Sequence, residues 1–188
     1  MSCVKIPPQV LPACNRIIVI GDLHGDWKVT RQILRKADVM DQNNQWIGND
    51  TKVVQMGDIV DGNRGNPNTM ISAPNQEILI MDLLDDLHQQ AEFYGGGVYC
   101  LLGNHELMNV MGDLRYASDA EINGMGGEQA RKSKFRPGGS IAQRLACSRN
   151  VIMKIGDFLF VHGGIENPED YNRIILNNFN KQVTEYLL

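Results

Sequence analysis

Four short blocks of residues suited to binding metals each follow an apolar run, and this pattern limits the folds open to the chain. The runs have the length and composition of buried strands and cover residues 16–20, 52–56, 98–102 and 158–161. The blocks after them are Gly21-Asp22-Leu23-His24-Gly25, Gly57-Asp58-Ile59-Val60-Asp61-Gly62, Gly103-Asn104-His105-Glu106 and His162-Gly163-Gly164. Because ligands bind at the carboxyl ends of the strands in an α/β sheet, we expect the four blocks to meet at one site.

The segments between these runs predict helices, which makes the chain an α/β protein with a mostly parallel sheet. Apolar residues near helical spacing indicate helices over about 27–37, 76–91 and 140–146, with a short one over 107–111. Gly156 and Asp157 are typical of a tight turn. We therefore expect residues 151–155 and 158–161 to form an antiparallel hairpin.

The chain is long enough to bury the core of one domain. It has 188 residues, of which 43% are hydrophobic. We expect a leader strand or loop over residues 1–15 and one domain over residues 16–188. Residues 118–139 are rich in Gly, Lys and Arg, which predicts a surface insertion within that domain.

Charge, apolar segments and cysteines indicate which binding partners and which cellular compartment suit this chain. The net charge of −4 does not suit a nucleic-acid binder, which needs clustered positive charge. No apolar run approaches the roughly 20 residues of a membrane helix, so we expect no membrane partner. The four cysteines lack a Cys-x-x-Cys pair, which indicates neither a zinc knuckle nor a disulfide framework and favours a reduced, cytoplasmic setting; they are Cys3, Cys14, Cys100 and Cys147.

The residue types in the blocks predict a pair of metal ions. Two divalent cations about 3.5–4 Å apart can clamp a phosphoryl group and activate a water molecule. We expect Asp58 to bridge them, with Asp22 and His24 completing the first metal site. Asn104 and His162 would bind the second metal. Mixed Asp, Asn and His ligands favour Mn²⁺, with Fe or Zn²⁺ as alternatives, over Ca²⁺.

Two further roles follow from the same blocks. We expect His105 to protonate the leaving oxygen, provided that a carboxylate raises its pKa and fixes its tautomer, and Asp61 is the candidate for that carboxylate. Arginine suits the phosphate oxygens because its planar fork makes two parallel hydrogen bonds. Arg64 and Arg115 are the candidates for this contact.

Taken together, the motifs resemble those of the phosphoprotein phosphatases among the calcineurin-like metallophosphoesterases. Asp-x-His-Gly, Gly-Asp-x-Val-Asp, Gly-Asn-His-Glu and His-Gly-Gly occur in the order of that family, and residues 103–116 and 159–165 are similar to its Shewanella-like branch. The resemblance covers about residues 17–175. It implies a sandwich of β-sheets flanked by helices, a dinuclear metal centre and direct attack by a metal-activated hydroxide without a phosphoenzyme.

The chain departs from the family pattern at two places. Where the family has Asp-Arg-Gly, this chain reads Asp61-Gly62-Asn63-Arg64-Gly65, so the arginine is displaced by two positions. The family also takes a further histidine for the second metal from beyond the His-Gly-Gly block, whereas no histidine follows His162 here. Residues 166–188 leave no room for the later strands of the family's second sheet, so we expect the domain to be incomplete at its C-terminus.

Three explanations fit the absent histidine: a truncated chain, a second metal held by fewer protein ligands plus water, or loss of turnover. The main hypothesis is a metal-dependent phosphomonoesterase acting on a phosphorylated protein or peptide, with phospho-Ser/Thr and phospho-Tyr both open. The alternatives are a hydrolase of nucleotides or dinucleoside polyphosphates and an inactive pseudophosphatase that serves as a binding module. The oligomeric state stays open.

Overall fold

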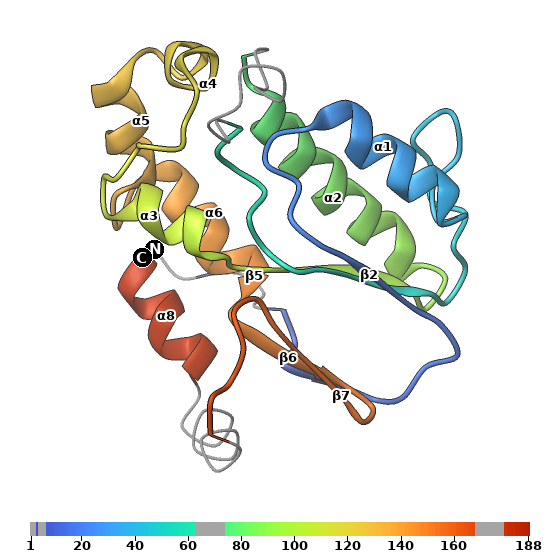
Figure 1. The fold of residues 1–188 in the computed structure, drawn as a ribbon. Helices are drawn as coiled ribbons and strands as arrows, with labels where there is room; N and C mark the ends of the chain where they lie inside the picture. The colour runs from blue at the N-terminus through green and yellow to red at the C-terminus, as the bar shows by residue number, and fades with distance from the viewer. Residues whose placement is uncertain (1–2, 4–6, 63–73, 168–178) are drawn as a thin grey trace.

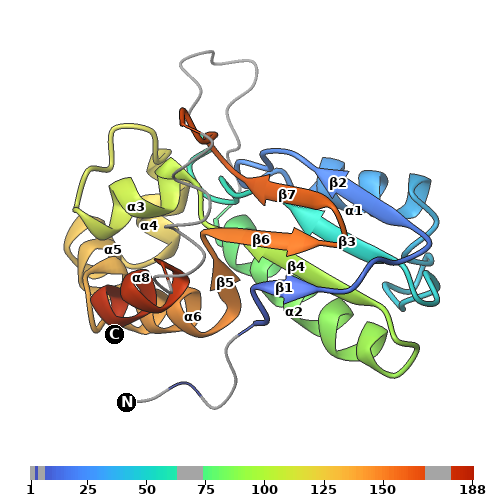
Figure 2. The same ribbon diagram turned by 90° about the horizontal axis from the view of Figure 1, so that it is seen from below.

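The computed structural model describes residues 3, 7–62, 74–167 and 179–188. Within them the strands form two sheets, as expected for the sandwich. The larger sheet is parallel and has the order β2 (Ile17–Ile20), β3 (Lys52–Gln55), β4 (Gly97–Leu101) and β5 (Arg149–Asn150). The smaller sheet has the order β1 (Val10–Leu11), β6 (Ile152–Ile155) and β7 (Phe158–Val161). Figure 2 shows the smaller sheet lying across one face of the larger one.

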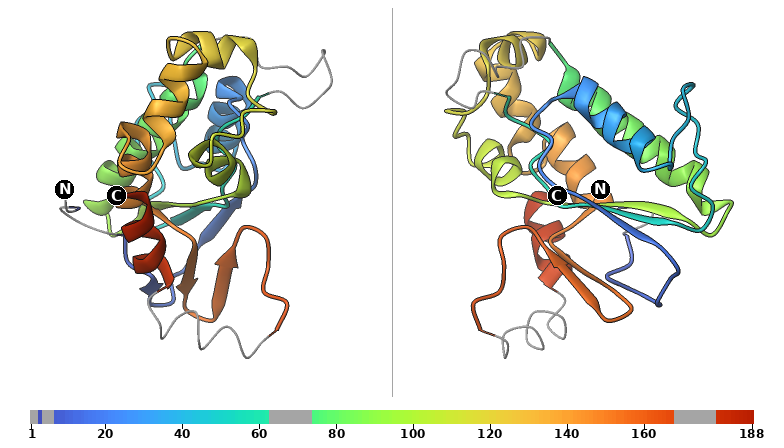
Figure 3. Two further views of the ribbon diagram at one scale, coloured as in Figure 1. Left: turned by 90° about the vertical axis from the view of Figure 1, so that its left-hand side faces the viewer. Right: turned by 45° about the vertical axis from the view of Figure 1, so that its right-hand side comes forward.

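Helices cover the other face of the larger sheet and one of its ends. α1 (Trp27–Lys36) and α2 (Gln76–Glu92) lie side by side on that face (Figure 1). The remaining described helices gather at the carboxyl end of the parallel strands; they are α3 (Asn104–Val110), α4 (Asp119–Gly124), α5 (Glu128–Phe135), α6 (Ser140–Ser148) and α8 (Phe179–Leu187). The larger sheet thus lies between α1 and α2 on one side and the smaller sheet on the other, as both views of Figure 3 show.

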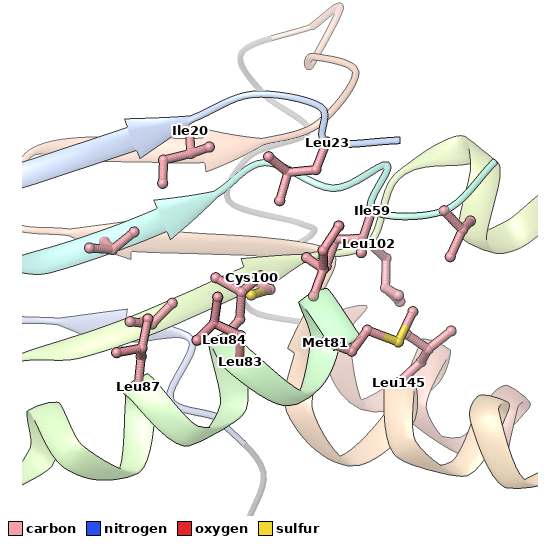
Figure 4. Packing of buried hydrophobic residues seen from close by; sticks show 14 of the residues in the cluster. Ile20, Leu23, Ile59, Met81, Leu83, Leu84, Leu87, Cys100, Leu102 and Leu145 are labelled. Carbon is pink, nitrogen blue, oxygen red and sulfur yellow. The ribbon is translucent and has the colours of Figure 1, made fainter. Parts of the chain in front are cut away.

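This layering explains why the central strands are apolar on both faces. In β3, Val53 faces the helices and Val54 faces the smaller sheet, and both are fully buried. Figure 4 shows leucines of α2, among them Leu84 and Leu87, packed beneath Cys100 of β4. Burial of these side chains holds the strands in place, so the turns that follow the strands start from fixed points.

Most predicted elements are confirmed. The predicted helices correspond to α1, α2, α3 and α6 within a few residues at each end. The predicted hairpin is β6 and β7, which pair antiparallel with Ile152 opposite Val161. The N-terminal leader contains β1, which runs parallel to β6 and extends the smaller sheet.

The structure corrects the expectation of a surface insertion over residues 118–139. This segment forms α4 and α5, and the Arg131 and Phe135 side chains of α5 are fully buried. The abundance of Gly and Lys suggested solvent exposure, but Gly126 and Gly127 adopt positive φ between two short helices. The segment therefore packs onto the core through the side chains of Arg131 and Phe135 and, as described below, supports the site.

The structure also corrects the expectation about disulfides. Cys3 and Cys147 form a disulfide across a sequence separation of 144 residues, while Cys14 and Cys100 are free. The spacing of the cysteines gave no signal for this pair because the fold alone brings the N-terminal segment beside α6.

Across the described ranges, none of the helices has the length and apolar character needed to cross a membrane.

Candidate metal centre

The four blocks converge at the carboxyl ends of the strands, as predicted. β2 and β3 pair with Ile20 opposite Gln55, and β3 and β4 pair with Gln55 opposite Cys100, so these three strands end at one level. The turns after them carry the Asp22, Asp58 and Asn104 blocks. The fourth block comes from the smaller sheet, since β7 ends one residue before His162.

The converging side chains form two groups suited to metal ions. In the first, one ligand atom each from Asp22, Asp58 and His162 lie within 4.8 Å of one another. In the second, ligand atoms of His24, Asp58 and His105 meet the same limit. Asp58 is 3% exposed and belongs to both groups, which is the position predicted for a bridging carboxylate.

The hydrogen bonds around His162 show that the donor set fits a divalent cation. His162 Nδ1 lies 2.8 Å from the carbonyl oxygen of Met56, so in the neutral ring Nδ1 carries the proton and Nε2 carries a lone pair. Nε2 lies 3.0 Å from Asn104 Oδ1 and 3.3 Å from Asp58 Oδ2. Three electron-rich atoms that face one another in this way repel unless a cation or a proton lies between them.

His24 has the same arrangement. Its Nδ1 lies 3.0 Å from the carbonyl oxygen of Val60, and its Nε2 lies 3.6 Å from Asp22 Oδ2. Asp22 is about half exposed, whereas the His24 side chain is mostly buried. The cluster therefore has a closed side near His24 and Asp58 and an open side near Asp22.

The backbone at the cluster adopts unusual conformations. His24, Asp58 and Asp61 have positive φ angles of 45°, 55° and 69°, which non-glycine residues rarely adopt. Backbone hydrogen bonds hold this geometry, since the N–H groups of Leu23 and His24 both donate to the Asp58 carbonyl at 2.9 Å. Such conformations cost about 1–3 kcal/mol each and persist where the surrounding structure over-determines them, often at functional sites.

His105 lies between the metal-ligand cluster and a buried carboxylate. Its Nδ1 lies 2.9 Å from Asp61 Oδ2, the contact that was predicted, and its Nε2 lies 3.9 Å from Asp58 Oδ2. His105 therefore meets the distance limit of the second group of ligands, although the sequence suggested that it would not touch metal. Its ring stands 4.9 Å from that of His24 and 5.0 Å from that of Tyr116, which is 41% exposed.

A buried network that the sequence did not predict supports Asp61. Its carboxylate accepts hydrogen bonds from Asn109 Nδ2 at 2.9 Å and from Arg131 Nη2 at 3.1 Å. Arg131 also pairs with Glu77 of α2, and Asp61, Glu77 and Arg131 are all fully buried. Desolvation raises the pKa of Glu77 to about 7 despite the opposing effect of Arg131. The sequence contains no signal for Arg131. It lies in the segment that was expected to be a surface insertion, where an arginine is normally exposed.

Glu106 is a second residue whose role was missed, although it stands in the quoted Gly-Asn-His-Glu motif. Its buried carboxylate accepts hydrogen bonds from the backbone N–H groups of Asp58 at 2.9 Å, Ile59 at 2.7 Å and Gly103 at 2.8 Å. Burial raises the pKa of Glu106, and these hydrogen bonds oppose that shift. Glu106 thus joins the turn that carries Asp58 to the turn that carries Asn104.

Of the two arginines predicted to bind phosphate, only Arg115 lies among the residues that the structure describes. The Arg115 side chain is 68% exposed and pairs with Asp113, with Nη2 2.8 Å from Oδ2. Arg64 lies outside the described residues. The other predicted site residues, from Asp22 to His162, are brought together as described above.

Comparisons with known proteins agree with this fold. The model of the family described as calcineurin-like phosphoesterase matches residues 15–188. Shewanella-like protein phosphatase 2 of Arabidopsis thaliana is 30% identical, over 80% of this chain and 46% of that protein. Shewanella-like protein phosphatase 1 of Plasmodium berghei is 32% identical, over 80% of this chain and 39% of that protein.

Among solved structures, the cold-active protein-tyrosine phosphatase of a psychrophilic Shewanella species has a TM-score of 0.78 and is 27% identical. The match covers 97% of this chain and 52% of that one. The chain thus spans about half the length of the proteins that it resembles.

Proposed function

Because this chain belongs to the calcineurin-like phosphoesterase family, we propose that it is a metal-dependent phosphomonoesterase that acts on phosphorylated proteins or peptides. The observation that carries the proposal is the buried Asp58 carboxylate shared by two groups of potential metal ligands. A shared carboxylate suits two cations a few ångströms apart, the arrangement that phosphoryl transfer uses.

In this proposal Asp22, His24 and Asp58 hold one divalent cation, and Asp58, Asn104 and His162 hold the other. This division is the one predicted from the sequence. It differs from the two groups above, where Asp22 lies with His162 and His24 with His105. The contacts that support it are His24 Nε2 at 3.6 Å from Asp22 Oδ2 and His162 Nε2 at 3.0 Å from Asn104 Oδ1. When bound, the two cations supply an activated water and neutralise the negative charge of the phosphoryl group. Mn²⁺ is the proposed metal, with Fe and Zn²⁺ as the alternatives that the same mixed ligands accept.

His105 is proposed to give a proton to the leaving oxygen of the substrate. Its Nδ1–H donates to Asp61, which keeps the ring oriented and stabilises the charged imidazolium. The Nε2 atom, on the side of Asp58, is then the atom from which the proton leaves. Asn109 and Arg131 keep the Asp61 carboxylate in position through their own hydrogen bonds.

Arg115 is proposed to bind the phosphate group of the substrate. Its ion pair with Asp113 lies on the surface, where such pairs are worth about 0–1 kcal/mol, so the guanidinium can leave it for a phosphate group. Arg64 stays a prediction.

Between the possible phosphoprotein substrates, the position of Tyr116 favours phosphotyrosine. A group that His105 protonates must lie beside its ring, and the exposed Tyr116 ring stands 5.0 Å from that ring. Two aromatic rings gain about 0.5–1.5 kcal/mol from offset or edge contact, which an aliphatic phosphoserine does not offer. The similar Shewanella structure is named a protein-tyrosine phosphatase, in agreement with this choice.

The test is to remove metal with a chelator, restore Mn²⁺ and measure both metal content and turnover. We expect about two Mn²⁺ per chain and hydrolysis of phosphopeptides, fastest for phosphotyrosine. Asp58→Asn is expected to lose both metals and turnover, whereas Asp86→Asn, an exposed position on α2, should lose neither.

Two outcomes would replace the proposal by the alternatives. Hydrolysis of dinucleoside polyphosphates without hydrolysis of phosphopeptides would favour a nucleotide hydrolase. Full metal content without hydrolysis of any phosphomonoester would favour a pseudophosphatase.

The one-domain organisation over residues 16–188 and the cytoplasmic location also stay predictions. The Cys3–Cys147 disulfide argues against the cytoplasm, because structural disulfides persist in oxidising compartments.

A further inference from the structure

Gln55, the last residue of β3, is a fully buried polar side chain that contacts the turns carrying Asp22 and Asp58. Its side-chain Nε2 donates one hydrogen bond to the carbonyl oxygen of Gly57 at 2.6 Å and another to that of Gly21 at 3.3 Å. A single amide group therefore contacts two backbone turns that are 36 residues apart in sequence, residues 21 and 57.

Each of these glycines immediately precedes an aspartate of the cluster. The carbonyl of Gly21 belongs to the planar peptide unit that begins Asp22, and the carbonyl of Gly57 belongs to the unit that begins Asp58. Fixing both carbonyls fixes the direction in which the two aspartates leave the backbone. The amide thus contributes to the separation of the two carboxylates, beside the backbone hydrogen bonds from Leu23 and His24 to the Asp58 carbonyl.

In the part of the chain that the structure describes, backbone hydrogen bonds join the two turns but do not use these two carbonyls. The last hydrogen bond of the β2–β3 ladder runs from the Met56 N–H to the Ile20 carbonyl at 2.8 Å. Beyond it, Gly57 turns out of the strand with a φ of 105°, and the N–H groups of Leu23 and His24 donate to the Asp58 carbonyl. Gln55 is the side-chain donor that the structure supplies to the carbonyls of both Gly21 and Gly57.

The oxygen atom of the same side-chain amide indicates that Gln55 serves the site more than the core. Among the described residues, the buried Gln55 Oε1 atom has no hydrogen-bond partner. A buried polar atom without a partner costs about 1–3 kcal/mol, and an apolar side chain of similar size avoids that cost. This cost offsets part of the stability that the two hydrogen bonds from Nε2 contribute, so the amide has little net value for stability alone.

We propose that Gln55 is a positioning residue that helps to set the separation of Asp22 and Asp58 and thereby the affinity of their site for a divalent cation. The inference rests on the proposed function, because it takes these aspartates as metal ligands. Gln55 itself touches neither the metal position nor the substrate.

The test compares Gln55→Met with Asn180→Leu in the full chain. Gln55→Met keeps the volume and removes the donor. Asn180 of α8 is a matched control, since its buried amide accepts hydrogen bonds from the N–H groups of Val151 and Ile152, and none of these residues belongs to the cluster. The readouts are Mn²⁺ affinity by titration calorimetry, magnetic coupling of the Mn²⁺ pair by electron paramagnetic resonance, and thermal unfolding without metal.

For Gln55→Met we expect Mn²⁺ affinity to fall about 10- to 100-fold, as for other residues that orient metal ligands. Coupling of the Mn²⁺ pair should weaken, while the unfolding temperature should change little. Asn180→Leu should show the opposite pattern, a lower unfolding temperature with unchanged Mn²⁺ affinity. A residue important only for stability would lower the unfolding temperature and leave the Mn²⁺ affinity unchanged.

Unchanged Mn²⁺ affinity and coupling in Gln55→Met would overturn the inference. If that variant fails to fold, Gln55→Leu provides the same comparison, and failure of both to fold would overturn the claim that Gln55 serves the metal site more than the core. A parent chain that binds Mn²⁺ without hydrolysing phosphomonoesters overturns only the proposed function. A parent chain that binds no divalent cation overturns both.

Discussion

Each histidine of the cluster uses Nδ1 for one hydrogen bond and turns Nε2 toward the other ligands, but the partners of Nδ1 differ. His24 and His162 face backbone carbonyls, whereas His105 faces the Asp61 carboxylate. A carbonyl fixes the neutral tautomer that binds metals, while a carboxylate stabilises the protonated ring that an acid catalyst needs. At the scale of single residues this difference favours His24 and His162 as ligands and His105 as the proton donor.

His105→Asn tests that assignment. We expect metal content to stay unchanged and kcat to fall about 10²-fold or more, since a general acid typically contributes this much. Metal analysis beside steady-state kinetics is the measurement. Loss of a metal ion from this variant would instead make His105 a ligand, which its distances to His24 and Asp58 permit.

Asp61→Asn should show the same defect in a milder form. The asparagine still accepts a hydrogen bond from His105 but no longer stabilises a charged imidazolium, so kcat should fall less than in His105→Asn at unchanged metal content. Asp82→Asn, an aspartate half exposed on α2, serves as the control and should leave kcat unchanged. Equal kcat in Asp61→Asn and the parent chain would remove Asp61 from the mechanism.

At the scale of elements, buried charges join α2, α5 and the turn after β3. One arginine, Arg131 of α5, faces two carboxylates, Glu77 of α2 and Asp61 of the turn. Desolvation of the buried carboxyl is the main reason that the pKa of Glu77 rises to about 7, while Arg131 opposes the rise and the negative charge of Asp61 adds to it. The network connects the helical side of the molecule to the carboxylate that orients His105.

The raised pKa of Glu77 predicts a pH dependence of stability. Its ordinary value is 4.5, so between about 4.5 and 7 the folded chain holds a proton that the unfolded chain has released. The unfolding free energy should then fall as the pH rises through this range, and Glu77→Gln should remove that part of the slope.

Urea unfolding of the metal-free chain at about pH 5 and about pH 8 measures the slope. Glu128→Gln, at an exposed ion pair with Lys132, should keep the slope of the parent chain. Parallel slopes in Glu77→Gln and the parent would mean that Glu77 stays ionised throughout, with Arg131 outweighing desolvation.

At the scale of the whole molecule, the N-terminal segment is fastened at two points. β1 pairs with β6 of the smaller sheet, and the Cys3–Cys147 disulfide connects the segment to α6. A cross-link between residues 144 apart in sequence restricts the unfolded chain strongly, and disulfides typically stabilise by about 2–4 kcal/mol.

We therefore expect Cys147→Ser to lower the unfolding temperature of the oxidised chain. A phosphine reductant should lower the parent to the level of the variant and leave the variant unchanged. Cys14→Ser, which removes a free thiol, is the control and should match the parent. Four reactive thiols in the unfolded, unreduced parent chain would show that the disulfide does not form.

The positions of the site residues could be predicted because the signals for them are local. Apolar runs mark the strands, and parallel strands bring their carboxyl ends together whatever the details of packing. The positions of Asp22, Asp58 and Asn104 then follow from residue type at the end of each run, whereas His162 reaches them from the antiparallel hairpin of the smaller sheet. The contact between His105 and Asp61 could be predicted in the same way, because both residues belong to those blocks.

The residues that hold the site in place depend on tertiary structure alone. Arg131 reaches Asp61 across 70 residues, and no periodicity or motif relates two such positions. A buried charge needs a partner of opposite sign, but which segment supplies it is decided by how the helices pack. The sequence by itself therefore determined which side chains gather at the strand ends, while the fold decided which buried groups fix their geometry and which cysteines pair.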